Sequence, residues 1–445
     1  MGFKKDFIFG AASAAYQIEG GWNEDGKGAS IWDVLSKAPD ICKHNENGDT
    51  ACDSYHRYKE DVAILKELGI KNYRFSIAWT RVLPEGTGRV NEAGLKYYSD
   101  LVDELLARGI TPYVTLYHWD LPYELYKRGG WLNPDSTQWF LEYIKTVVDA
   151  LSDRVQNWFT INEPQCFIGL GHQIGKHAPF LRQSNRDLIE MARNVMLSHG
   201  RAAKYIREKA KTAPKIGFAP IGPVIPPKDE SPEAIEAAYA ASFDDLCYDI
   251  KGRNIINMMS LSLWSDPIVL GRLPEAKGVF SEADLAEIAQ PLDFYGANIY
   301  YDQMGFDREF SYENGAYVGS PRTATDWPVT PEALYWGPKF LYRRYGLPVI
   351  ISEDGMAGYD WVHLDGKVHD PARIDFLQRY LGELERAAEE VPVLGYFYWS
   401  LLDNLEWDSG YDKRFGLVHV DFRTFERTIK DSGYWYADYI KSKTE

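Results

Sequence analysis

Trp158-Phe159-Thr160-Ile161-Asn162-Glu163-Pro164 begins as a run of aromatic and β-branched residues, which is typical of a buried strand. The run ends in an amide, a carboxylate and a proline, and proline stops regular strand pairing because it has no N–H donor. Asn162 and Glu163 are therefore expected at the carboxyl end of a strand, where a loop begins.

A second stretch repeats this design. Pro348-Val349-Ile350-Ile351-Ser352-Glu353-Asp354-Gly355 is an apolar strand followed by a glutamate and a turn-forming Asp-Gly pair. Two glutamates at the carboxyl ends of two different strands predict a site built on paired carboxylates.

The rest of the chain alternates between strand and helix patterns. A helical face, for example, carries Tyr58, Val62, Leu65 and Leu68 and stops at Gly69. The strands are predicted at residues 7–12, 73–78, 111–116, 158–161, 215–219, 293–298, 348–352 and 393–399. Eight such repeats without a linker predict an α/β fold, a single (β/α)8 TIM barrel that forms one catalytic domain over residues 1–445.

A doubly wound sheet is the competing fold. It would require a glycine-rich turn after the first strand, where this chain has Ala12-Ser13-Ala14-Ala15-Tyr16-Gln17. Two insertions, residues 20–51 and 301–330, are too long for ordinary connections. In a barrel these long loops are expected on the catalytic face, at the carboxyl ends of the strands.

Composition limits the partners of the protein. A formal net charge of -16 argues against binding to nucleic acid or to an anionic membrane surface. The chain contains no apolar run of about 18 residues that could span a membrane, and its first residues lack the apolar core of a signal peptide. Cys42, Cys52, Cys166 and Cys247 show no C-x-x-C spacing, which favours a reduced, cytoplasmic setting. The sequence leaves open whether the protein is a homo-oligomer.

Chemistry in a barrel comes from residues at the carboxyl ends of the strands. Those ends carry amides, carboxylates, one histidine and several indoles, which suit a polyhydroxylated ring with a flat C–H face. No metal-binding cluster or phosphate cradle is recognisable, so neither a metal nor a cofactor is expected. The strand-end residues are Gln17, Arg74, His118, Trp119, Asn162, Glu163, Asn298, Tyr300, Glu353, Trp399, Glu406 and Trp407.

Motifs along nearly the whole chain resemble those of the β-glucosidases of family one of the glycoside hydrolases. They are Phe7-Ile8-Phe9-Gly10-Ala11-Ala12-Ser13, Gln17-Ile18-Glu19-Gly20, Tyr73-Arg74-Phe75-Ser76, His118-Trp119-Asp120-Leu121-Pro122, Asn162-Glu163-Pro164, Gly296-Ala297-Asn298-Ile299-Tyr300, Glu353-Asp354-Gly355 and Trp399-Ser400-Leu401-Leu402-Asp403-Asn404-Leu405-Glu406-Trp407. Their combination, order and spacing make the resemblance specific.

The resemblance implies a role for each site residue. Glu163 would be the general acid/base and Glu353 the nucleophile of a retaining mechanism, with Arg74 and Tyr300 beside the nucleophile. Substrate binding would involve Gln17, His118, Trp119, Asn162, Asn298, Tyr300, Glu406 and Trp407, with Trp399 as the floor under the sugar. The expected substrates are cello-oligosaccharides and aryl β-glucosides, with side activity on β-galactosides or β-fucosides.

Two other functions compete with this one. Enzymes that act on 6-phosphoglycosides replace the Glu-Trp pair, whereas this chain keeps Glu406-Trp407. A non-catalytic glycan-binding barrel is disfavoured because both glutamates are present.

The chain departs from the family pattern at two positions. Gln165 stands where tryptophan is common, which leaves the contacts to the leaving group open. Asp354 stands where the motif usually has asparagine. It either raises the pKa of Glu353 by charge repulsion, or points away and caps the turn at Gly355.

Overall fold

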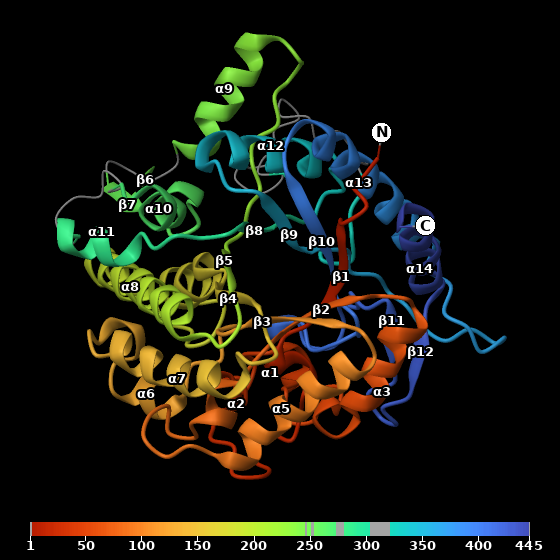
Figure 1. Ribbon diagram of the computed structural model, residues 1–445, viewed down its shortest axis with the longest axis horizontal. Helices are drawn as coiled ribbons and strands as arrows, with labels where there is room; N and C mark the ends of the chain where they lie inside the picture. The colour runs from red at the N-terminus through yellow and green to blue at the C-terminus, as the bar shows by residue number, and fades with distance from the viewer. Residues whose placement is uncertain (1, 245–246, 251–252, 273–279, 303–320, 445) are drawn as a thin grey trace.

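The computed structural model describes residues 2–244, 247–250, 253–272, 280–302 and 321–444. Part of the predicted insertion 301–330 therefore lies outside the described residues. The chain forms a ring of strands surrounded by helices (Figure 1). The predicted fold class, a (β/α)8 barrel, is confirmed.

Eight parallel strands form one sheet in the order β5-β4-β3-β2-β1-β10-β9-β8. The sheet nearly closes on itself, because the backbone N–H of Gly222 donates to the carbonyl of Asn298 at 2.9 Å across the gap between its two edge strands. The strands are β1 (Ile8–Ala12), β2 (Asn72–Ser76), β3 (Thr111–Thr115), β4 (Asn157–Asn162), β5 (Lys215–Ala219), β8 (Tyr295–Asn298), β9 (Val349–Asp354) and β10 (Val393–Trp399).

Amphipathic helices cover the outside of this barrel (Figure 1). Each turns its apolar residues toward the strands; in α7, for instance, Trp139, Tyr143 and Val147 are buried. The larger helices are α3 (Ser54–Glu67), α5 (Glu92–Ala107), α7 (Ser136–Leu151), α8 (Asn185–Lys209), α12 (Ala333–Tyr345), α13 (Pro371–Glu390) and α14 (Asp431–Thr444).

Shorter elements fill the connections. The predicted insertion 20–51 is not structureless, because it contains a helix that begins at a capping box formed by Ser30 and Asp33. The short elements are α1 (Ala15–Ile18), α2 (Ile31–Leu35), η1 (Lys43–Asn45), α4 (Trp79–Val82), α6 (Tyr123–Lys127), η2 (Gly130–Leu132), η3 (Gln165–Ile174), α9 (Pro232–Phe243), β6 (Cys247–Ile250), β7 (Arg253–Ile256), α10 (Leu261–Ser265), η4 (Asp266–Leu270), α11 (Glu282–Ile288), η7 (Trp407–Ser409), β11 (Val418–Val420) and β12 (Arg427–Ile429).

The barrel interior is packed with side chains rather than open. Tyr113, Phe159, Phe294, Ile350 and Phe397 form a buried cluster inside it. Their strands continue above this cluster to the candidate site residues, so the interior core forms a solid base under the site.

Candidate active site

Both strands that bring a predicted glutamate to the site, β4 and β9, carry a register shift near their carboxyl ends. The pairing of β4 with β5 shifts between Phe159 and Asn162. The pairing of β9 with β10 shifts between Ile351 and Asp354. An extra residue in a strand interrupts the alternation of side chains and re-aims them. As a result, two consecutive residues of β9 turn their side chains to the inside of the barrel.

Glu353 is one of these two residues, and its carboxylate is held on both oxygens. Arg74 Nη1 donates to Oε1 at 2.5 Å, and the hydroxyl of Tyr300 donates to Oε2 at 2.8 Å. Burial raises the pKa of Glu353, whereas Arg74 and then Tyr300 lower it by stabilising the anion. Glu353 is therefore a buried carboxylate with a full set of charge-stabilising donors.

The buried guanidinium of Arg74 connects several strands. Besides Glu353, it donates to the hydroxyl of Thr115 at 3.0 Å, to the carbonyl of Ser352 at 3.0 Å and to Oδ1 of Asn162 at 2.6 Å. Because the donor fork of arginine is planar and rigid, these contacts fix where Glu353 and Asn162 lie relative to each other.

Glu163 follows the end of β4 and has a different environment. Its Oε1 accepts one hydrogen bond, from Nδ2 of Asn298 at 2.8 Å. Burial first, and then repulsion from Glu353, raise the pKa of Glu163 well above its ordinary value. The backbone φ of Glu163 is 42°, in the left-handed region that costs energy for a non-glycine residue. Glu163 thus holds its proton at a strained backbone position beside the carboxyl group of Glu353.

The amide of Asn298 has one fixed orientation. Its Oδ1 accepts a hydrogen bond from the hydroxyl of Ser352 at 2.6 Å, while its Nδ2 donates to Asn162 Oδ1 at 3.1 Å and to Glu163. Ser352 was not among the predicted site residues. The only sequence signal for it is a hydroxyl immediately before Glu353 in an otherwise apolar strand.

His118 and Gln17 offer polar atoms that have no partner among the described residues. Asn162 Oδ1 already accepts from Arg74, so its Nδ2 donates to His118 Nε2 at 3.2 Å. Burial and then Arg74 lower the pKa of His118 well below its ordinary value, so the ring is neutral and its proton lies on Nδ1. This Nδ1 and Gln17 Oε1 are buried and unpaired. They leave one donor and one acceptor for a ligand.

Glu406 lies next to Gln17, which donates to its Oε2 at 3.5 Å as well as to the carbonyl of Leu405 at 2.8 Å. Burial raises the pKa of Glu406 to about 8, and repulsion from Asp408, Glu353 and Glu163 adds to the shift. Glu406 is therefore close enough to both predicted catalytic glutamates to be affected by their charge.

Indole rings form the apolar walls. Trp407 stacks on Trp119 with ring centroids 4.3 Å apart, and Trp399 stacks on His118 at 5.8 Å. Trp119 Nε1 donates to the carbonyl of Asn162 at 3.1 Å. Trp119 and Trp407 have φ values of 75° and 47°, so both share the backbone strain seen at Glu163. The structure thus brings all the predicted site residues into one connected group.

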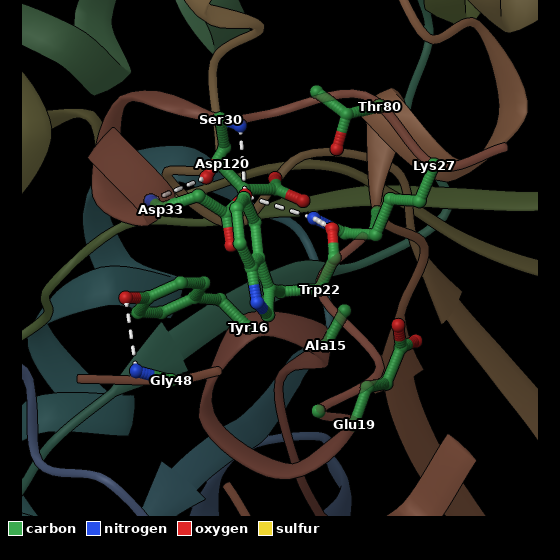
Figure 2. A pocket seen from close by; sticks show the side chains of 12 residues that line it. Ala15, Tyr16, Glu19, Trp22, Lys27, Ser30, Asp33, Gly48, Thr80 and Asp120 are labelled. Carbon is green, nitrogen blue, oxygen red and sulfur yellow. Dashed lines mark hydrogen bonds and ion pairs between the residues drawn. The ribbon is translucent and has the colours of Figure 1, made fainter. Parts of the chain in front are cut away.

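A polar cavity lies beside the segment that carries His118 and Trp119 (Figure 2). In it, Lys27 Nζ and the backbone N–H of Ser30 both donate to Oδ2 of Asp33, at 2.8 and 2.7 Å. Asp120, the residue after Trp119, also lines this cavity, and burial raises its pKa to about 7. The cavity volume of about 10 Å³ is room for about one water molecule, so it supports the wall and does not bind a sugar.

The two departures from the family pattern have distinct surroundings. Asp354 faces outward, where its Oδ2 accepts from the hydroxyl of Tyr396 at 2.8 Å, so the interpretation in which it points away matches the structure. Gln165 is buried at the start of η3, and its Oε1 accepts from the N–H of Ile221 at 3.4 Å.

Two basic residues after the Glu406-Trp407 pair are engaged with the protein. Lys413 Nζ donates to the carbonyl of Ala324 at 2.5 Å, and Arg414 Nη1 donates to Asp403 Oδ2 at 2.7 Å. This arrangement disfavours a phosphate site there.

Within the described ranges, no group of three or more His, Cys, Asp and Glu side chains is placed to hold a metal ion. None of the described helices is long and apolar enough to cross a membrane.

Comparison with known proteins finds relatives that match the chain over nearly its whole length. The family model for glycosyl hydrolase family 1 matches residues 1–445. The chain is 45% identical to "Beta-glucosidase A" of Acetivibrio thermocellus, over 99% of this chain and 98% of the relative. It is 41% identical to "1,4-beta-D-glucan glucohydrolase" of Thermotoga neapolitana, with the same coverage. Among solved structures, "Beta-glucosidase from Thermotoga maritima in complex with glucoimidazole" superposes with a TM-score of 0.88 at 41% identity, covering 100% of both chains.

Proposed function

This chain belongs to glycosyl hydrolase family 1 and is a retaining β-glucosidase. From that premise we propose that it hydrolyses terminal nonreducing β-D-glucosyl residues by double displacement. Glu353 is the nucleophile and Glu163 is the acid/base. The observation that carries these assignments is the contrast between the two carboxyl groups. Glu353 accepts from a guanidinium and a phenol, whereas Glu163 accepts only from neutral groups, the amide of Asn298 and the thiol of Cys166.

The first step uses both groups at once. Glu353 attacks the anomeric carbon, and Glu163 gives its proton to the leaving oxygen. Arg74 and Tyr300 stabilise the anion of Glu353 against the burial that raises its pKa, while burial and then repulsion from Glu353 raise the pKa of Glu163 to about 8. Carboxyl groups whose environments separate their pKa values in this way can act as acid and nucleophile at the same pH.

The second step reverses the roles. Once Glu353 is esterified by the sugar, its negative charge is gone and the repulsion that raises the pKa of Glu163 disappears. Glu163 then accepts a proton from water as that water attacks the anomeric carbon. The configuration of the sugar is retained because two inversions occur.

The sugar is held by the unpaired polar atoms and the indoles. Gln17 Oε1 accepts from a hydroxyl and His118 Nδ1 donates to one. Glu406 accepts from two further hydroxyls. Asn162, Asn298 and Tyr300 line the side next to the catalytic pair. Trp399 is the floor beneath the ring, and Trp119 and Trp407 close the wall.

The proposal extends to substrate range, location and organisation. The name of the Thermotoga neapolitana relative supports cello-oligosaccharides as substrates, besides aryl β-glucosides, with side activity on β-galactosides or β-fucosides. The whole of residues 1–445 acts as one catalytic domain. A cytoplasmic location is supported by Cys42, Cys52 and Cys166, which are buried free thiols.

A panel of nitrophenyl β-glycosides, a 6-phosphorylated glucoside and cellobiose tests this function. We expect turnover of the unphosphorylated glucosides, and a β-configured glucose as the first product seen by proton NMR. Glu353→Gln should abolish turnover, while Asp354→Asn, which changes the neighbouring but outward-facing carboxyl, is the matched control. Selective cleavage of the phosphorylated substrate, an α-configured first product, or turnover that survives in Glu353→Gln would each contradict the proposal.

A further inference from the structure

A cluster of exposed apolar side chains lies on the loop that leaves the carboxyl end of β9, a few residues after Glu353. Tyr359, Trp361, Val362 and Leu364 have exposed fractions of 67%, 60%, 44% and 111%. Because exposed large apolar side chains gathered in one place are unusual on a folded protein, such a patch indicates a binding surface.

The base of this loop is firmly anchored. Asp360, between the two aromatic residues, points inward and accepts from Arg373 Nη2 at 2.7 Å and from Lys430 Nζ at 2.6 Å. Gly358 makes this approach possible, since a Cβ there would lie 2.4 Å from Asp360 Oδ1 and 2.9 Å from Arg373 Nη2. With Asp360 held inward, its neighbours Tyr359 and Trp361 are held outward. The exposed rings are therefore preorganised, which lowers the entropy lost when a ligand binds.

Tyr359 connects the patch to the wall of the active site. The hydroxyl of Tyr359 lies 3.4 Å from the carbonyl of Ala324, and Lys413 Nζ sits 5.4 Å from the Tyr359 ring centroid. Ala324 packs against the inner cluster that contains Trp399.

Trp327, in the same segment as Ala324, continues the wall inward. Its ring centroid is 5.2 Å from that of Tyr300, the residue that donates to Glu353. Aromatic side chains thus lead from the nucleophile, through Trp327, to the exposed surface.

We propose that Tyr359 and Trp361 form an outer platform on which the leaving-side sugar rings of a longer β-linked gluco-oligosaccharide stack. Flat aromatic faces suit the C–H faces of pyranose rings, and one face of Trp361 is already backed by His363 at 5.0 Å. Neutral oligosaccharide is the favoured ligand because Tyr359 contacts Ala324 in the segment whose Trp327 packs beside Tyr300, and Trp361 follows Tyr359 by two residues on the same loop. The platform rests on the proposed function and names the longer substrates of the same site.

Chain length is the variable that tests the platform. For Trp361→Ala and Tyr359→Ala, the ratio of kcat/KM on cellotetraose to kcat/KM on nitrophenyl β-glucoside should fall about tenfold, the equivalent of one lost aromatic contact. Trp361→Phe keeps a flat ring and should restore most of that ratio. Tyr434→Ala, which removes an exposed tyrosine from α14, is the control and should leave the ratio unchanged.

A binding measurement separates failure of the platform from failure of the proposed function. Calorimetric titration of cellotetraose into Glu353→Gln should show about tenfold tighter binding than into Glu353→Gln with Trp361→Ala. This difference does not depend on turnover, so it tests the platform even if the catalytic roles are wrong. Absence of turnover by the native enzyme on every β-glucoside would overturn the proposed function alone.

Three results would overturn the platform. The first is an unchanged ratio of the two kcat/KM values together with equal affinities for cellotetraose, and the second is an equal loss of kcat/KM on the short and long substrates. The third is a change of oligomeric state in Trp361→Ala without a chain-length effect. The last result, measured by analytical ultracentrifugation, would show that the patch is an interface between copies of this chain.

Discussion

Asp354 directly follows Glu353 in β9, yet the two carboxyl groups lie on opposite faces of the strand. Glu353 accepts from Arg74 inside the barrel, and Asp354 accepts from Tyr396 outside it. Burial raises the pKa of Asp354 well above its ordinary value. The carboxyl group of Asp354 therefore points away from the active site, and burial favours its neutral form.

Asp354→Asn should leave the acid limb of the pH profile of kcat/KM unchanged, because the removed group faces away from Glu353. It should alter stability instead. The folded protein holds the Asp354 proton more tightly than the unfolded chain does, so the native protein loses stability as the pH rises above the pKa of the unfolded state. When the pH rises from 5 to 8, the free energy of unfolding measured with urea should therefore fall less for Asp354→Asn than for the native protein. An acid limb that moves to lower pH would instead establish charge coupling between Asp354 and Glu353.

Ser352→Ala should shift the basic limb of the kcat/KM profile to higher pH. Without the serine hydroxyl, the Asn298 amide is free to turn, and its donation to Glu163, which lowers the pKa of that group, is weakened. We expect a loss of about three- to tenfold in kcat/KM at neutral pH, the cost of one buried hydrogen bond. Ser352→Thr retains a hydroxyl and should keep the native limb. A rate loss with an unmoved basic limb would show that Ser352 acts only in packing.

Glu406→Ala should reduce kcat/KM for β-glucosides by about 30- to 1000-fold, which corresponds to about 2–4 kcal/mol for two unpaired hydroxyl contacts. The reason is that Glu406 accepts from two hydroxyls of the bound sugar in the proposed site. Glu426→Ala removes an exposed carboxylate outside the site and is the control. A loss below tenfold would place Glu406 outside the sugar-binding site.

Lys430→Met should lower the free energy of unfolding by about 3 kcal/mol, because removing one partner from a buried ion network leaves uncompensated charge. Lys430 Nζ donates to both Asp360 and Asp403 at 2.6 Å, and its side chain is fully buried. Urea unfolding measures the effect, with Lys441→Met on the exposed face of α14 as the control. Equal midpoints for the two variants would show that the remaining partners, Arg373 and Arg414, neutralise both aspartates.

Much of the fold follows from the sequence because parallel strands buried on both faces are continuous apolar runs. The predicted ranges 215–219 and 393–399 coincide with β5 and β10, and the remaining barrel strands differ by a few residues at their ends. The site residues could be chosen because a barrel gathers side chains at the carboxyl ends of its strands. The location of a helix such as α9 around the barrel has no comparable signal in the sequence, because it depends on packing contacts with distant parts of the chain.

The orientation of side chains at the strand ends could not be predicted. Simple alternation would place Ser352 and Asp354 together on the face opposite Glu353. The register shift in β9 turns Ser352 inward to Asn298 and leaves only Asp354 outside. Such a shift depends on pairing with β8 and β10, which lie far away in the sequence, so no local pattern reveals it.

Chemical rescue of Glu353→Gly tests the central claim most directly, because it identifies the group that attacks the anomeric carbon. Azide added to this variant should enter the space left by the missing carboxylate, restore turnover of a dinitrophenyl β-glucoside and yield α-glucosyl azide. The parallel variant Glu163→Ala, which keeps the nucleophile, should lose far more activity on poor leaving groups than on dinitrophenolate. Rescue that gives β-glucosyl azide from Glu353→Gly, or no rescue at all by azide or formate, would contradict the assignment of Glu353 as the nucleophile.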